Sequence, residues 1–83
     1  MSWNYRVILH DEDVDKENHW YGIHEVYYKK DNRTIDTWSA NPSPVFCNVN
    51  DRISDTLEIM EQAAGRPILK MSKLEKKNNG EKE

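Results

Sequence analysis

The stretch His19-Trp20-Tyr21-Gly22-Ile23-His24-Glu25-Val26-Tyr27-Tyr28 decides the fold, because it is the densest run of aromatic and β-branched residues in the chain. Residues of these two kinds are enriched in strands, where they pack well on a pleated, half-buried surface. We therefore expect this stretch to form the central strand of a sheet, and the other segments to pair with it or to cover it.

Shorter strands are predicted on both sides of this stretch. Between Trp3 and Leu9 the residue types alternate with a period of two, which is typical of a strand with one face better buried than the other. The acidic segment 11–18 is too poor in apolar residues to be buried, so it forms the connecting loop. Asp31-Asn32 supplies turn chemistry before a third strand over residues 34–38. Together these segments predict a three-stranded antiparallel β-meander.

One amphipathic helix is predicted after the segment 41–44, whose two prolines end strand pairing. Asn48 is the expected N-cap, with Asp51 three positions later, and the helix should run from about residue 49 to 64. Its apolar residues recur at helical spacing and should pack on one face of the sheet. They are Val49, Ile53, Leu57, Met60 and Ala64.

The predicted fold class is therefore α+β, with a single domain over residues 1–69. Residues 70–83 hold five lysines and three glutamates among other polar residues, and this composition predicts a disordered, lysine-rich tail with at most a short helical extension. Ile68 and Leu69 are apolar, and the alternative is a longer sheet in which they form a fourth strand.

Charge predicts which face of the sheet the helix covers. A register that places Arg6 opposite Glu25 gives a cross-strand ion pair on one face. The opposite face is then expected to be the core, with Tyr5, Val7, Leu9, Gly22, His24, Val26 and Tyr28. The ion-pair face is unusually aromatic and aliphatic for a surface in water, so we predict an interaction site there. Its residues are Arg6, Ile8, Tyr21, Ile23, Glu25 and Tyr27.

Size and charge exclude several classes of protein. Eighty-three residues form one small core, which argues against a large enclosed active site. Residues 1–69 hold seven basic and twelve acidic groups, which gives a net charge of −5. This charge repels phosphate backbones, so we do not expect nucleic acid as the main partner. With the single Cys47 and no apolar run for a signal peptide or membrane span, the sequence predicts a cytoplasmic protein without membrane contact.

Residues suited to catalysis or metal binding do not form a complete motif. The alternating acids of residues 11–15 imitate a calcium loop, but lysine stands where the loop needs glycine, and glycine where it needs glutamate. His24 and Glu25 are neighbours on a strand, so they point to opposite faces and do not form a compact zinc site. We expect His24 to be hydrogen-bonded inside the core. No catalytic residue, metal or cofactor is predicted.

The sequence thus predicts a small, non-enzymatic protein-interaction module. Its partner is another protein or a second copy of the chain, which makes a homodimer possible. One alternative is a protein that binds a ligand or a metal, or an enzyme, that uses His24 and His10. Another is weak association with nucleic acid through the basic tail.

Several segments also resemble a family of short bacterial proteins of uncharacterised function. These segments are Trp3-Asn4-Tyr5-Arg6-Val7, Ile23-His24-Glu25-Val26-Tyr27-Tyr28, Asn41-Pro42-Ser43-Pro44, a helix with Leu57 and Met60, and Pro67-Ile68-Leu69. The resemblance covers about residues 3–69. It implies a source in bacteria or their phages and an independently folding domain, but no activity. The acidic loop and the lysine-rich tail depart from the family pattern.

Overall fold

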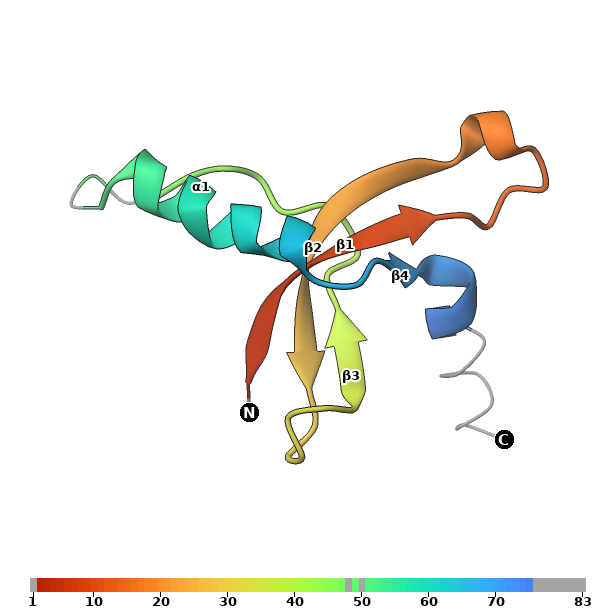
Figure 1. Ribbon diagram of the computed structural model, residues 1–83, viewed down its shortest axis with the longest axis horizontal. Coiled ribbons are helices and arrows are strands. Elements are labelled where there is room, and N and C mark those ends of the chain that lie inside the picture. The colour runs from red at the N-terminus through yellow and green to blue at the C-terminus, as the bar shows by residue number, and fades with distance from the viewer. Residues whose placement is uncertain (1, 48, 50, 76–83) are drawn as a thin grey trace.

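The fold is a small α+β domain built on a curled, mixed sheet of four strands (Figure 1). The computed structural model describes residues 2–47, 49 and 51–75. In chain order the strands are β1 (Trp3–His10), β2 (Trp20–Tyr28), β3 (Ile35–Trp38) and β4 (Leu69–Lys70). Their order across the sheet is β3-β2-β1-β4. The long β1–β2 pair is the centre of the molecule, as the aromatic stretch predicts.

The three predicted strands are present, and their antiparallel pairing is confirmed. The sheet is nevertheless not a simple meander, because β4 adds to the other edge of β1 and runs parallel to it. Leu69 pairs with Ile8, so the alternative with a fourth strand describes the sheet better than three strands alone.

The tight turn between β2 and β3 forms as its residues predict. Asn32 adopts the left-handed backbone conformation, with φ of 59°. The Asp31 carboxylate accepts hydrogen bonds from the backbone N–H groups of Arg33 and Thr34, each at 2.9 Å. A hydrogen bond from the Thr34 hydroxyl, together with these two backbone bonds, lowers the pKa of Asp31 to about 2. The loop between β1 and β2 contains a short 3₁₀ helix, η1 (Lys16–Asn18).

The register of β1 on β2 differs by one residue from the predicted one. Arg6 lies opposite His24, and Tyr5 lies opposite Glu25. Because side chains alternate between faces, a slip of one residue moves every β1 side chain to the other face. Ile8, which we predicted on the interaction face, is therefore fully buried in the core with Val26. The predicted pair of Arg6 and Glu25 does not form, since they lie on opposite faces.

The helix α1 (Ile53–Glu61) continues into a 3₁₀ turn, η2 (Gln62–Gly65), that lies against β1. The predicted cap Asn48 lies outside the described residues. The helix begins four residues later than predicted, and Arg52 at its N-cap position makes no side-chain capping hydrogen bond. Most of the predicted apolar stripe is not buried. Met60 is only 4% exposed, whereas Ile53 and Leu57 are 47% and 48% exposed, because α1 projects away from the sheet (Figure 1).

Residues 70–75, which the sequence places in a disordered tail with at most a short helical extension, belong to the domain. Lys70 ends β4, and residues 71–75 form a helical turn. Met71 and Leu74 are 6% and 9% exposed and pack in the core with Ile8, Val26 and Tyr28. The domain therefore extends at least six residues past the predicted boundary. Residues 76–83 of the predicted tail lie outside the described part of the chain.

Asp11 holds this last helical turn on the sheet. Its carboxylate accepts hydrogen bonds from the Ser72 backbone N–H at 2.9 Å and from the Ser72 hydroxyl at 2.8 Å. These two bonds lower the pKa of Asp11 below its usual value. An acid that the sequence assigns only to a solvated loop thus caps the segment that closes the core.

Within residues 2–47, 49 and 51–75, no helix has the length and apolar character to cross a membrane.

Candidate functional site

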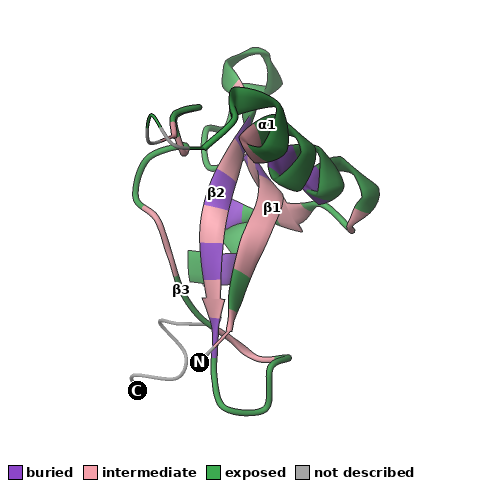
Figure 2. Ribbon diagram, turned by 90° about the vertical axis from the view of Figure 1, so that its left-hand side faces the viewer, coloured by how far each residue is buried: buried purple, intermediate pink, exposed green. Residues whose placement is uncertain are grey.

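The outer face of the β1–β2 pair is the first candidate site. We call it the aromatic face. It consists of Trp3, Tyr5, Val7 and Leu9 of β1 and Tyr21, Ile23, Glu25 and Tyr27 of β2. None of these eight side chains is buried. The opposite face holds Ile8, Val26 and Tyr28 of the core. Figure 2 shows how buried and less buried residues alternate along β2. The sheet is therefore packed on one side and only partly covered on the other.

The rings of the aromatic face contact one another at its N-terminal end. Trp3 meets Tyr5 edge to face, with ring centroids 5.2 Å apart, and lies 6.4 Å from the ring of Tyr27. The Tyr27 hydroxyl donates a 2.7 Å hydrogen bond to the Glu25 carboxylate, which raises the pKa of Tyr27. Contacts between these rings fix their orientation, and Trp3 still keeps 49% of its surface exposed.

Four of the six predicted interaction residues lie together on this face: Tyr21, Ile23, Glu25 and Tyr27. Arg6 and Ile8 do not. Arg6 lies on the core side, where its guanidinium donates to the Tyr28 hydroxyl at 3.0 Å and to the Pro67 carbonyl at 2.6 Å. Sequence reasoning missed Trp3 and Tyr5, although their alternation with Asn4 would place them correctly once the register is known.

A pair of buried histidines forms the second candidate site, on the core side. His24 is fully buried, His10 is 9% exposed, and their Nε2 atoms are 2.8 Å apart. His10 stacks on Trp20, with ring centroids 3.7 Å apart. Gly22 makes this possible, because a Cβ there would come within 3.0 Å of both His24 Nε2 and Trp20 and within 3.2 Å of Pro42. The close neighbours of Gly22 are therefore these side chains, and none of them belongs to α1.

Hydrogen bonding assigns the protons of this pair. The Ser39 carbonyl is 2.9 Å from His24 Nδ1 and only accepts, so Nδ1 carries the proton and His24 Nε2 is the acceptor. His10 Nε2–H then donates to His24. His10 Nδ1 lies 3.7 Å from the Glu12 carboxylate, on the solvent side of the pair. His10 can therefore accept one additional proton, at Nδ1, without loss of the bond between the rings. A proton on His24 Nε2 would break that bond.

Burial, followed by the repulsion from His24, lowers the pKa of His10 from 6.5. Between that lowered pKa and about pH 6.5 the unfolded chain binds more protons than the folded chain. The contribution of His10 to the free energy of unfolding is therefore at its full value above pH 6.5 and decreases as the pH falls. We expect urea midpoints to decrease from pH 7.5 to 5.5, and His10→Gln to flatten this dependence. Glu75 acts oppositely at lower pH, because burial and Glu12 raise its pKa above 4.5. An unchanged slope in His10→Gln would contradict the assignment.

The histidine pair does not resemble a metal site. Its two Nε2 atoms are occupied by each other, and His24 Nδ1 is occupied by Ser39. Among the described residues, no group of three or more histidine, cysteine, aspartate and glutamate side chains has the arrangement of a metal site. As expected from the alternation of faces, His24 is hydrogen-bonded inside the core and Glu25 lies on the opposite face.

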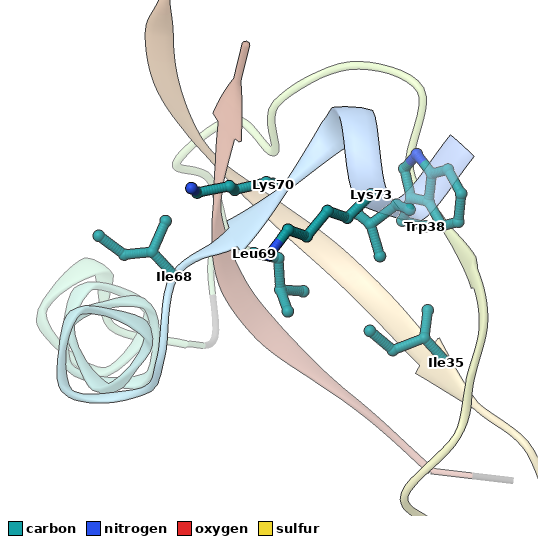
Figure 3. Close-up of a pocket in the computed structure, with 7 residues that line it drawn as sticks. Ile35, Trp38, Ile68, Leu69, Lys70 and Lys73 are labelled. Carbon is teal, nitrogen blue, oxygen red and sulfur yellow. The ribbon is translucent and has the colours of Figure 1, made fainter. Parts of the chain in front are cut away.

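A third feature is a small pocket on the core side, between β3 and the segment around β4 (Figure 3). It measures about 240 Å³ and is lined by Ile35, Trp38, Ile68, Leu69, Lys70, Lys73 and Leu74. Drug-sized ligands occupy pockets of roughly 300–1,000 Å³, so this volume suits a gap beside the last helical turn better than a ligand site.

Comparisons with protein-family models, with curated proteins and with solved structures find no match to this chain. The resemblance to short bacterial proteins therefore stays a prediction.

Proposed function

We propose that the chain is a small, non-enzymatic protein-interaction module that binds through its aromatic face. The observation that carries this proposal is the absence of any buried side chain on that face, which holds four aromatic rings. Trp3 and Tyr21 of this face are among the large hydrophobic residues of the described chain that stay exposed. A contiguous exposed patch of aromatic and apolar side chains is typical of a surface that a partner covers.

The aromatic face is suited to an apolar partner surface. Its single ionisable carboxylate, on Glu25, already accepts the hydroxyl of Tyr27, so few charged groups must be desolvated on binding. Tyrosine and tryptophan are enriched at protein interfaces because they bring large area at low entropic cost. A second copy of the chain offers the same face, and a two-fold axis would make the contact self-complementary.

The non-enzymatic part of the proposal is supported by the hydrogen bonds of His24. A general base needs a nitrogen that reaches the proton of a substrate. The nitrogens of His24 face Ser39 and His10 instead, inside the core.

Light scattering with Tyr21→Glu tests the role of this face. Tyr21 is 63% exposed, so a carboxylate there leaves the core intact while it places a charge on the aromatic face. We expect the wild-type chain to form dimers at NMR concentrations and Tyr21→Glu to remain monomeric with an unchanged melting temperature. Val14→Glu is the matched control, because Val14 is fully exposed in the loop.

Two outcomes would count against this proposal. If the variant and the wild type dimerise equally, the face is not the contact. If both are monomers and an apolar dye such as ANS binds neither, the face does not behave as an uncovered apolar surface.

A further inference from the structure

The outer edge of β1 is only partly paired. The Tyr28 N–H donates to the Ser2 carbonyl, so the even-numbered positions of this strand direct their backbone groups toward β2. The odd-numbered positions Trp3 and Tyr5 then direct theirs away from it. On that outer side β4 pairs only with Ile8 and Leu9. Within the described chain, no strand lies on the outer side of the N-terminal half of β1.

One outward group in this half of the edge has a partner: the Tyr5 carbonyl accepts a 3.2 Å hydrogen bond from Arg66 Nη1. Figure 1 shows the open angle between α1 and the N-terminal half of β1. A pocket of about 210 Å³ lies there, lined by Trp3, Asn4, Tyr5, Ile59, Gln62 and Arg66. It is too small for a drug-sized ligand, but it suits one large apolar side chain.

We propose that this edge binds an extended peptide segment of a partner protein by strand addition. The segment pairs with the backbone of Trp3 and with the Tyr5 N–H, places one large apolar side chain against Ile59, and brings a carboxylate to Arg66. An unpaired strand edge presents alternating donors and acceptors, which another strand satisfies best, and such addition is a recurring mode of peptide recognition.

Charge distinguishes this occupant from a second copy of the chain. Arg66 is the charged residue among those that line the pocket, and no carboxylate of the described residues forms an ion pair with it. Antiparallel pairing of two copies about Tyr5 would bring their two Arg66 side chains together, which is unfavourable. An acidic group on a foreign strand instead gains a charge-assisted hydrogen bond from this guanidinium.

This inference rests on the proposed function as an interaction module, but it uses the strand edge and not the sheet face. Its test starts from random dodecapeptides displayed on phage and selected on the full-length chain. Synthetic versions of the enriched peptides are then titrated into the wild type, Trp3→Pro and Trp3→Ala. Both variants lose the indole, but Trp3→Pro alone also loses the outward N–H.

We expect the enriched peptides to share an acidic residue and alternating apolar positions. Trp3→Pro should bind them about tenfold more weakly than Trp3→Ala, and Arg66→Gln should weaken them by a similar factor. Hydrogen exchange of the Tyr5 amide in the wild type should slow when peptide binds. This last measurement decides the matter if Trp3→Pro does not fold.

Other outcomes overturn the inference in distinguishable ways. Equal affinities of folded Trp3→Pro and Trp3→Ala, or an unprotected Tyr5 amide, exclude strand addition. If Tyr21→Glu abolishes peptide binding while Trp3→Pro does not, the aromatic face is the site and the edge is not. A selection without enrichment excludes the peptide occupant, while the dimer measurement still tests the face. A dimer that Trp3→Pro dissociates and Trp3→Ala does not assigns the edge to a second copy.

Discussion

Ending the chain after Lys70 is expected to unfold the protein, whereas ending it after Glu75 should leave the fold intact. The shorter chain loses Met71 and Leu74, which are buried beside Ile8 and Val26. Each large side chain removed from a core costs about 2–5 kcal/mol, and two of them approach the roughly 5–15 kcal/mol that stabilise a typical small protein. Circular dichroism and urea unfolding measure the difference.

A point variant separates packing from chain length. Leu74→Ala in the full chain should lower the free energy of unfolding by about 2–5 kcal/mol, whereas Lys73→Ala, an exposed neighbour, should change it by less than about 0.5 kcal/mol. If the chain that ends at Lys70 keeps a cooperative transition with an unchanged midpoint, residues 71–75 do not belong to the core.

Composition does not predict that residues 70–75 belong to the core, because it averages over the positions that matter. Most of residues 70–83 are polar or charged, which is typical of disorder. Met71 and Leu74 are three residues apart, so one helical turn places both on the same side. The feature that orders this turn is Asp11, at a distance of 61 residues from Ser72, and no local pattern indicates that pairing.

The strands could be predicted because alternation and turn chemistry are local, but their register could not. We chose the register from an ion pair between Arg6 and Glu25. An exposed pair contributes about 0–1 kcal/mol, whereas full burial of an isoleucine contributes about 1.5–3 kcal/mol. The structure buries Ile8 completely, in agreement with the larger of these two terms.

The same error in register hid the histidine pair. His10 lies opposite Trp20, and His24 lies four pairs farther along the sheet on the same face, so their contact across Gly22 follows only from the correct alignment. With the predicted alignment these two histidines would lie on opposite faces.

Replacing His24 with alanine is expected to lower the free energy of unfolding by about 3–5 kcal/mol. The fully buried imidazole leaves a cavity, and its loss removes the acceptor of His10 Nε2–H and the donor to the Ser39 carbonyl. His19→Ala is the matched control. Among the described residues, the His19 ring bonds only to the Asp13 carbonyl in the loop, so its removal should cost less than about 1 kcal/mol.

A double-mutant cycle shows whether the two buried rings act together. Each single change, His10→Ala or His24→Ala, leaves the other ring nitrogen in the core without its partner, and the double change removes both groups. We expect the double variant to be less destabilised than the sum of the single variants, by about 0.5–3 kcal/mol. Strict additivity would show that the two rings are not coupled in the core.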